Sequence, residues 1–166
     1  MRGSILDVLF VIAVIFAITV GLIFGGLLSN KLQEKLNSSN VLSPADVNRT
    51  NALFNKANEG LGVLDYMILG AFIFLSLGMI ISAFWIQTHP AFFVVFLVIQ
   101  IFVIFISNVF TEVYTKLTAD PMLQPYANQY TTSRTIMQNL PFFTLIISSL
   151  VAIVMYGKGA GTTYEM

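Results

Sequence analysis

The 166-residue chain contains no cysteine and a single histidine, and these shortages exclude several kinds of chemistry. Without thiols there can be no disulfide, thiolate metal site, iron–sulfur cluster or thiol redox reaction. The lone His89 cannot supply a bis-histidine haem site or a two-histidine metal site within one chain. No glycine-rich phosphate loop or Ser-His-Asp constellation occurs in a suitable context. We therefore predict no catalytic residue, no metal ligand, no cofactor and no enzymatic activity.

Charge is also scarce. Charged residues make up 10% of the chain, against about 25% in soluble domains, whereas 57% of the residues are hydrophobic. Eight basic and eight acidic residues cancel, so the chain has no electrostatic footprint for nucleic acid. A chain this apolar must be covered largely by lipid, which predicts an integral membrane protein.

Four apolar runs predict an all-α fold with four transmembrane helices in a single membrane domain, residues 1–166. About 20 apolar residues, at a rise of about 1.5 Å each, cross a hydrocarbon core of about 30 Å. The first run is longer than the core of a secretory signal, about 7 to 15 residues, so we interpret it as an uncleaved anchor. The predicted spans are 5–28, 63–86, 91–110 and 137–156.

A helical hairpin, residues 29–62, is predicted to project from one face of the membrane. The first helix has no break before Asn37, and Ser43-Pro44-Ala45-Asp46 carries the start signals of the second. Gly60-Leu61-Gly62 is expected to kink or break this second helix. Its apolar face, expected to pack against Leu32 and Leu36, comprises Val47, Phe54, Ala57, Leu61 and Leu64. Its polar residues, which fall largely elsewhere on the helical wheel, are Asn48, Arg49, Asn55, Asn58 and Glu59.

A second polar segment, residues 111–136, lies between the third and fourth spans. The third helix is expected to continue to Leu117, and residues 121–132, with two prolines and several tyrosines and amides, are expected to form a loop. Ser133 is expected to cap a short lead into the last span, and Pro141 to kink or restart that helix. Elsewhere, Gln87-Thr88-His89-Pro90 predicts a tight turn and residues 157–166 a flexible tail.

Small residues at intervals of four mark a candidate helix-packing surface. Ala17, Gly21 and Gly25 follow this pattern in the first span, and Gly78 with Ser82 repeats it more weakly in the second. Such spacing lets two helix backbones approach closely in a membrane. The pattern fits either packing within this chain or contact with a second copy or a partner helix.

Three polar side chains fall within or beside the apolar runs: Asp65, Gln100 and Asn108. Asp65 is either a first-turn or interfacial residue, or it pairs with a polar group on another helix. For Gln100 and Asn108 we favour hydrogen bonds between helices over a role in transport.

Four spans place both termini on one side of the membrane and residues 29–62 and 111–136 on the other. The positive-inside rule puts these two polar segments on the cytoplasmic or interior side, because they hold most of the basic residues. Two glycosylation sequons, at Asn37 and Asn48, would argue the reverse in a secretory membrane, but such triplets arise readily by chance. We therefore expect a bacterial, archaeal or viral membrane.

These observations favour a non-catalytic structural or assembly subunit that packs in a larger membrane complex. A virion membrane protein is one version. Its partners would be the lipid bilayer, membrane or capsid proteins and, in one variant, further copies of itself. The residues expected to dock partners are Lys31, Lys35, Arg49, Phe54, Lys56, Tyr126 and Tyr130. The alternative is a small oligomeric pore, holin-like or ion-conducting, using Asp65, Gln100 and Asn108, although the phenylalanine-rich third span lacks the polar stripe of a water-filled path.

Overall fold

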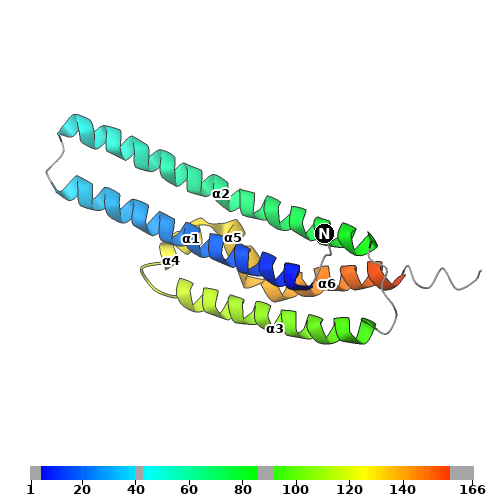
Figure 1. Ribbon diagram of the computed structural model, residues 1–166. Coiled ribbons are helices and arrows are strands. Elements are labelled where there is room, and N and C mark those ends of the chain that lie inside the picture. Colours follow the sequence, from blue (N-terminus) through cyan, green and yellow to red (C-terminus); the bar gives the residue numbers. More distant parts are fainter. Residues whose placement is uncertain (1–4, 40–42, 86–91, 158–166) are drawn as a thin grey trace, which may run out of the picture.

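The computed structural model of the chain describes residues 5–39, 43–85 and 92–157. Within these ranges the ordered elements are all helices: α1 (Ile5–Ser38), α2 (Pro44–Trp85), α3 (Phe92–Thr118), α4 (Gln124–Gln129), α5 (Thr131–Gln138) and α6 (Leu140–Gly157) (Figure 1). The long helices α1, α2, α3 and α6 are each apolar and long enough to cross a membrane. This confirms the prediction of an all-α membrane protein with four spans.

The four long helices form one bundle in which α1 contacts α2 and α3, and α6 completes the ring by contacting α2 and α3 (Figure 1). The start of α1, the end of α2, the start of α3 and the end of α6 lie at one end of the bundle (Figure 1). The short helices α4 and α5 lie toward the other end. The turn predicted at 87–90, and the tail beyond Gly157, fall outside the described residues.

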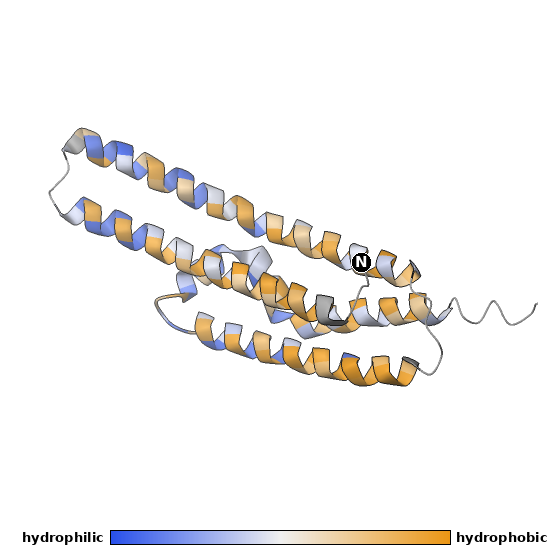
Figure 2. Cartoon of the chain, viewed as in Figure 1, coloured by the Kyte–Doolittle hydropathy of each residue, from blue (hydrophilic) through white to orange (hydrophobic). Residues whose placement is uncertain are grey.

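Helices α1 and α2 extend well past α3 and α6, so they form the projecting hairpin that the sequence predicted (Figure 1). Hydrophilic residues dominate this extension, whereas the bundle beneath it is mostly hydrophobic (Figure 2). The second arm starts as predicted: the Ser43 hydroxyl donates to Asp46 Oδ2 at 2.6 Å, and the Asp46 amide donates back to Ser43 Oγ at 3.4 Å.

The predicted break at Gly60-Leu61-Gly62 is wrong, because α2 is one continuous helix of 42 residues. A helical glycine costs only about 1 kcal/mol relative to alanine, and tertiary contacts can offset that. Leu61 supplies one such contact, since its Cδ2 would lie 3.5 Å from a Cβ built on Gly25. Asn58 and Asp65, on either side of the glycines, also bond to other parts of the chain.

The contact surface between α1 and α2, here called the seam, follows a seven-residue repeat. The α2 residues at alternating steps of four and three are all buried or partly buried: Val47, Asn51, Phe54, Asn58, Leu61, Asp65 and Ile68. Three amide hydrogen bonds cross the seam. Gln33 Nε2 and Asn37 Nδ2 donate to Asn51 Oδ1 at 2.9 and 3.1 Å, and Asn58 Nδ2 donates to Asn30 Oδ1 at 3.2 Å.

These bonds correct the expected division of α2 into an apolar inner face and a polar outer face. Asn58 lies in the seam, not on the polar face, because the α1 amide of Asn30 gives it a partner. Leu36 is partly buried as expected, but Leu32 is 53% exposed. Ala57 and Leu64 are likewise exposed. The hairpin therefore pairs through amides as well as apolar side chains.

An Asn51→Ala substitution should loosen the hairpin without unfolding the bundle. The side-chain amides of Gln33 and Asn37 would lose their common acceptor. Because water can replace that acceptor in part, the hairpin should lose only about 1 kcal/mol of stability. Backbone amides of residues 30–38 should then exchange with solvent about fivefold faster in detergent micelles. Asn55→Ala is the matched control, because Asn55 is exposed. Equal exchange in both variants would mean that the amide contact contributes nothing.

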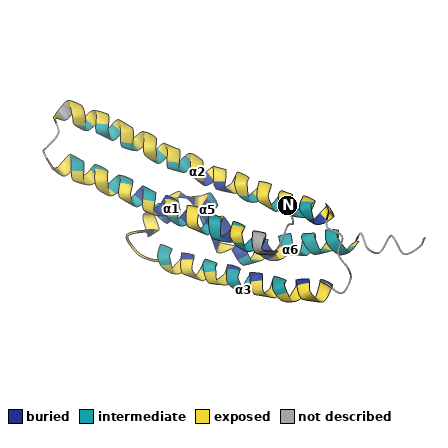
Figure 3. Cartoon of the chain, viewed as in Figure 1, coloured by how far each residue is buried: buried dark blue, intermediate teal, exposed yellow. Residues whose placement is uncertain are grey.

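The segment predicted as a loop, residues 121–132, is mostly helical, because it includes α4 and the start of α5. Asp120 Oδ1 accepts the Met122 amide at 2.8 Å and orders the turn that leads into α4, where Pro125 occupies the first turn. Helix α4 packs on α1, and α5 packs on α2 and α3. Buried residues gather where α5 meets the long helices (Figure 3). This packing, which local sequence does not reveal, replaces the loop with helices.

Candidate functional site

Asp65 of α2 lies where α5 meets the bundle, and it is only 5% exposed. Its Oδ2 accepts the Thr132 amide at 3.1 Å, and its Oδ1 accepts the Ser133 amide at 2.7 Å together with the Ser133 hydroxyl. These amides are the second and third of α5, the two that an N-cap side chain ordinarily satisfies. Tyr130, the residue in the N-cap position, makes no such bond. Asp65 therefore caps α5 from a different helix.

This arrangement decides between the two alternatives for Asp65. The carboxylate is not a first-turn residue, because it lies in the interior of α2, and it pairs with polar groups of another helix, α5. Ser133 was expected to cap the lead into the last span. It is instead the third residue of α5 and one of the groups that Asp65 holds.

Tyr126 and Tyr130 attach the α4 region to α1. A Cβ added to Gly26 would lie 2.8 Å from Tyr130 Oη and 3.3 Å from Tyr126 Cδ1, so both rings rest on this glycine. Tyr130 is 1% exposed and Tyr126 is partly buried. The expectation that the two tyrosines dock partner proteins is therefore wrong for Tyr130 and weakened for Tyr126. Burial, reinforced by the Asp65 carboxylate, raises the pKa of Tyr130.

The helix restart at Pro141 depends on a hydroxyl from α3. Proline has no amide hydrogen, so the carbonyl four residues earlier, that of Met137, loses its helical donor. Thr111 Oγ1 donates to that carbonyl oxygen at 2.8 Å. Asn139 separates α5 from α6, which begins at Leu140. The predicted restart is confirmed, while its support by Thr111 was not foreseen.

A double substitution tests this role of Thr111. Thr111→Val should destabilise the fold by about 1 to 2 kcal/mol, because the Met137 carbonyl loses its donor in an apolar setting. In a Pro141→Ala background the new amide hydrogen can serve that carbonyl, so the cost of Thr111→Val should fall by at least about half. Unfolding in mixed micelles measures the destabilisation by Thr111→Val in both backgrounds. If Thr111→Val were equally destabilising in the Pro141→Ala background, Thr111 would not act as the donor to the Met137 carbonyl.

Hydroxyl groups, not amides, connect α3 with α6. Ser107 Oγ lies 3.1 Å from Thr144 Oγ1, and each hydroxyl is also within hydrogen-bond distance of a carbonyl oxygen one turn back in its own helix, at 2.9 and 2.7 Å. Since each hydroxyl has one hydrogen, one of the two donates across to the other helix while the other donates to its own carbonyl. Gln100 is partly buried and Asn108 is exposed, and neither side chain makes a hydrogen bond with a described residue. The expected interhelical role of these two amides is thus taken by Ser107 and Thr144. Short hydroxyl side chains satisfy themselves on their own helix and still allow close packing.

The small-residue pattern divides into two groups. Gly25 faces Leu61 within the chain, because a Cβ built on it would lie at an ordinary 3.5 Å from Leu61 Cδ2. Ala17 is exposed, and a Cβ built on Gly21 or Gly78 would meet nothing within 4 Å, so packing among the described residues does not account for these three. Ser82 is partly buried. The glycine that permits the closest contact is Gly26, which the spacing of four did not select.

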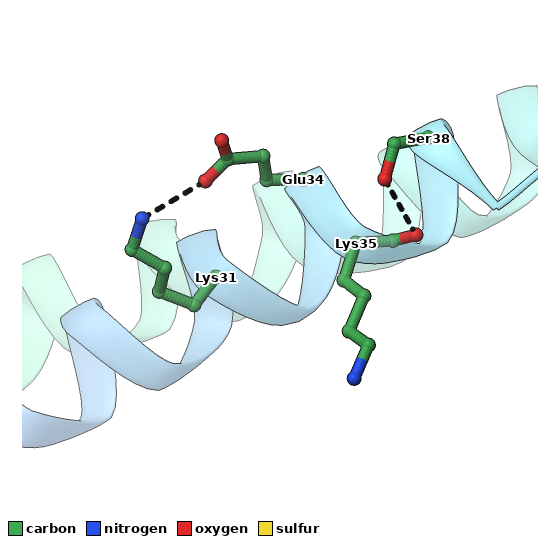
Figure 4. Close-up of polar contacts among 4 residues, drawn as sticks. All are labelled: Lys31, Glu34, Lys35 and Ser38. Atoms are coloured by element: carbon green, nitrogen blue, oxygen red, sulfur yellow. Dashed lines mark hydrogen bonds and ion pairs between the residues drawn. The ribbon is translucent and has the colours of Figure 1, made fainter.

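The hairpin residues expected to dock partners differ in availability. Lys31 Nζ pairs with Glu34 Oε2 at 3.1 Å, whereas the Lys35 side chain runs away from that pair (Figure 4). Arg49 and Lys56 are exposed, and like Lys35 they form no ion pair with any described residue. Phe54 is partly buried in the seam and therefore belongs to the hairpin's own packing.

The polar groups of the bundle thus cap a helix, complete a broken hydrogen-bond ladder and join helix pairs. Across residues 5–39, 43–85 and 92–157, no three His, Cys, Asp or Glu side chains gather in a way that could hold a metal ion. The fold is that of a multi-pass α-helical membrane protein with a projecting two-helix hairpin. Comparisons with protein-family models, curated proteins and solved structures give no match for the chain.

Proposed function

We propose that this protein is a non-catalytic structural or assembly subunit of a larger membrane complex, and that its hairpin docks partner proteins. The observation that carries the proposal is the continuation of α1 and α2 beyond the bundle as a hydrophilic, amide-paired hairpin (Figures 1 and 2). That extension is not needed to complete the bundle, and it presents the exposed cations Lys35, Arg49 and Lys56.

The α4–α5 region takes a supporting role in this proposal. Asp65 and Gly26 attach it to the base of the hairpin, so it braces the point where α1 and α2 leave the bundle. Docking is therefore assigned to the hairpin and not to residues 111–136. Residues 29–62 and 111–136 together hold most of the basic residues of the chain. By the positive-inside rule, this favours the cytoplasm, or the interior of a virion, as the compartment into which the hairpin projects.

The alternative of an oligomeric pore has less support. Both Asp65 oxygens are engaged by α5, and Asn108 is exposed on the outside of the single-chain bundle. Conduction would thus require a second copy to place Asn108 beside a water-filled path.

A paired seven-residue deletion tests the docking role. Removing residues 31–37 and 49–55 shortens both arms by one repeat and preserves the phase of the seam. The spans should still fold, as judged by circular dichroism and gel filtration in mild detergent. Proteins that co-purify with the full chain from its native membrane should be lost or reduced at least about tenfold. An unchanged set of co-purifying proteins, with the deletion variant correctly folded, would refute the proposal.

A further inference from the structure

The two flanks of the hairpin differ in chemistry. Its amide bonds fix which residues lie in the seam: Asn30, Gln33 and Asn37 on α1, and Asn51 and Asn58 on α2. In an antiparallel helix pair, the residues just before the seam positions of both helices share one flank. The residues just after those positions share the opposite flank.

The flank formed by the preceding residues carries no charge, and we call it the uncharged flank. It comprises Ser29, Leu32, Leu36, Thr50, Leu53 and Ala57. The opposite flank comprises Lys31, Glu34, Ser38, Ala52, Asn55 and Glu59. The two large leucines in the middle of the uncharged flank, Leu32 and Leu53, are 53% and 68% exposed. The hairpin is therefore amphipathic as a unit, with an apolar strip in its water-exposed part.

Lipid is poorly placed to cover this strip. The hairpin continues the direction of α1 and α2 out of the bundle and does not fold back along it (Figure 1). Its residues are largely hydrophilic, in contrast to the spans (Figure 2). Exposed apolar side chains gathered on one flank of such an element form a candidate surface for another protein.

Unpaired cations border the uncharged flank on both helices. Lys35 lies on the back of α1, two residues from Gln33 and Asn37, and Arg49 and Lys56 lie on the back of α2, each two residues from an amide of the seam. The exposed Lys35 side chain runs clear of the Lys31–Glu34 pair (Figure 4). Two copies of the chain joined through this flank in one membrane would set α1 of each against α2 of the other and bring these cations together. That repulsion disfavours a second copy as the occupant.

We propose that the uncharged flank binds an amphipathic helix of a partner protein, one whose apolar stripe is bordered on both sides by Asp or Glu. Such a helix would bury Leu32 and Leu53, and its carboxylates would pair with Lys35 on one side and with Arg49 and Lys56 on the other. The result is a three-helix bundle built on the hairpin. This inference rests on the proposed function, since it names the kind of partner that the docking element takes.

Binding of a designed helix to the full chain in neutral-lipid nanodiscs tests the inference. The probe is a fluorescent peptide of about three heptads with a leucine–alanine stripe and glutamate borders, and its counterpart has lysine borders. The glutamate peptide should bind at least about tenfold more tightly than the lysine peptide. Leu32→Asn combined with Leu53→Asn should weaken binding at least about tenfold, and Lys35→Glu, Arg49→Glu and Lys56→Glu together should reverse the preference between the peptides. Asn55→Ala with Glu59→Gln, on the opposite flank, is the matched control and should leave binding unchanged.

Three results would overturn the inference: no binding of either peptide, equal binding of both, or light scattering that shows a dimer of the chain broken by Leu32→Asn with Leu53→Asn. If the peptides fail while the paired deletion still removes native partners, the inference falls and the proposed function stands. If the deletion leaves the native partners in place, the proposed function fails whatever the peptides do.

Discussion

An Asp65→Leu variant is expected to lose about 3 to 5 kcal/mol of stability and to release α5 from the bundle. The carboxylate accepts two backbone amides and one hydroxyl in a buried setting, and each donor left without an acceptor there costs about 1 to 3 kcal/mol. Unfolding in mixed micelles would measure the loss. Limited proteolysis should show new cleavage between α3 and α6, and amides of Thr132 and Ser133 should lose their protection from exchange.

Two further variants separate capping from other roles of this carboxylate. Ser133→Ala removes only the hydroxyl donor and should cost about 1 kcal/mol. Glu59→Leu, at an exposed carboxylate on the same helix, should have little effect. If Asp65→Leu left stability unchanged and altered ion conductance in liposomes, the carboxylate would serve a pathway and the capping role would be wrong.

The fold class and the hairpin were predictable because they depend on features that are local in sequence. Length and apolarity define a membrane span whatever its neighbours are, and Ser43-Pro44-Ala45-Asp46 signals a helix start by itself. The same local reasoning failed at Gly60-Leu61-Gly62. There the expected break depended on a helix cost of about 1 kcal/mol per glycine, which contacts with α1 can offset.

The cluster around Asp65 was beyond local reasoning because its partners are far away in sequence. Nothing near Asp65 in the sequence indicates that its carboxylate caps α5, a helix that starts 66 residues later, at Thr131 (131 − 65 = 66). Pro141 does predict that the Met137 carbonyl lacks its helical donor, but the sequence does not indicate which hydroxyl donates to it instead. Asn51 and Asn58 could have been assigned to the seam, since they continue a seven-residue spacing with Asp65. A search for apolar faces alone overlooks amides at such positions.

Gly26→Ala is expected to destabilise the protein by about 1 to 3 kcal/mol, whereas Gly21→Ala should be neutral or stabilising by up to about 1 kcal/mol. Both residues are glycines of α1, so intrinsic helix propensity affects them alike. They differ in surroundings: a Cβ at Gly26 would lie 2.8 Å from Tyr130 Oη, and a Cβ at Gly21 would have no neighbour within 4 Å. The 2.8 Å approach is too short for a Cβ, so the buried Tyr130 ring would have to shift.

The shortest approach at Gly26 involves one atom, Tyr130 Oη, whereas Tyr126 Cδ1, at 3.3 Å, would have to give by only a few tenths of an ångström. This difference allows a second variant that tests the Tyr130 contact. Tyr130→Phe removes the hydroxyl oxygen and leaves Cε2 as the nearest atom of that ring, at an ordinary 3.5 Å. The hydroxyl has no hydrogen-bond partner among the described residues, so its removal should itself cost little. Gly26→Ala should therefore be tolerated at least about 1 kcal/mol better in the Tyr130→Phe background, as measured by unfolding in micelles. Equal costs in the two backgrounds would show that Tyr130 does not limit the space at Gly26, and the attachment of α4 to α1 would then need another cause.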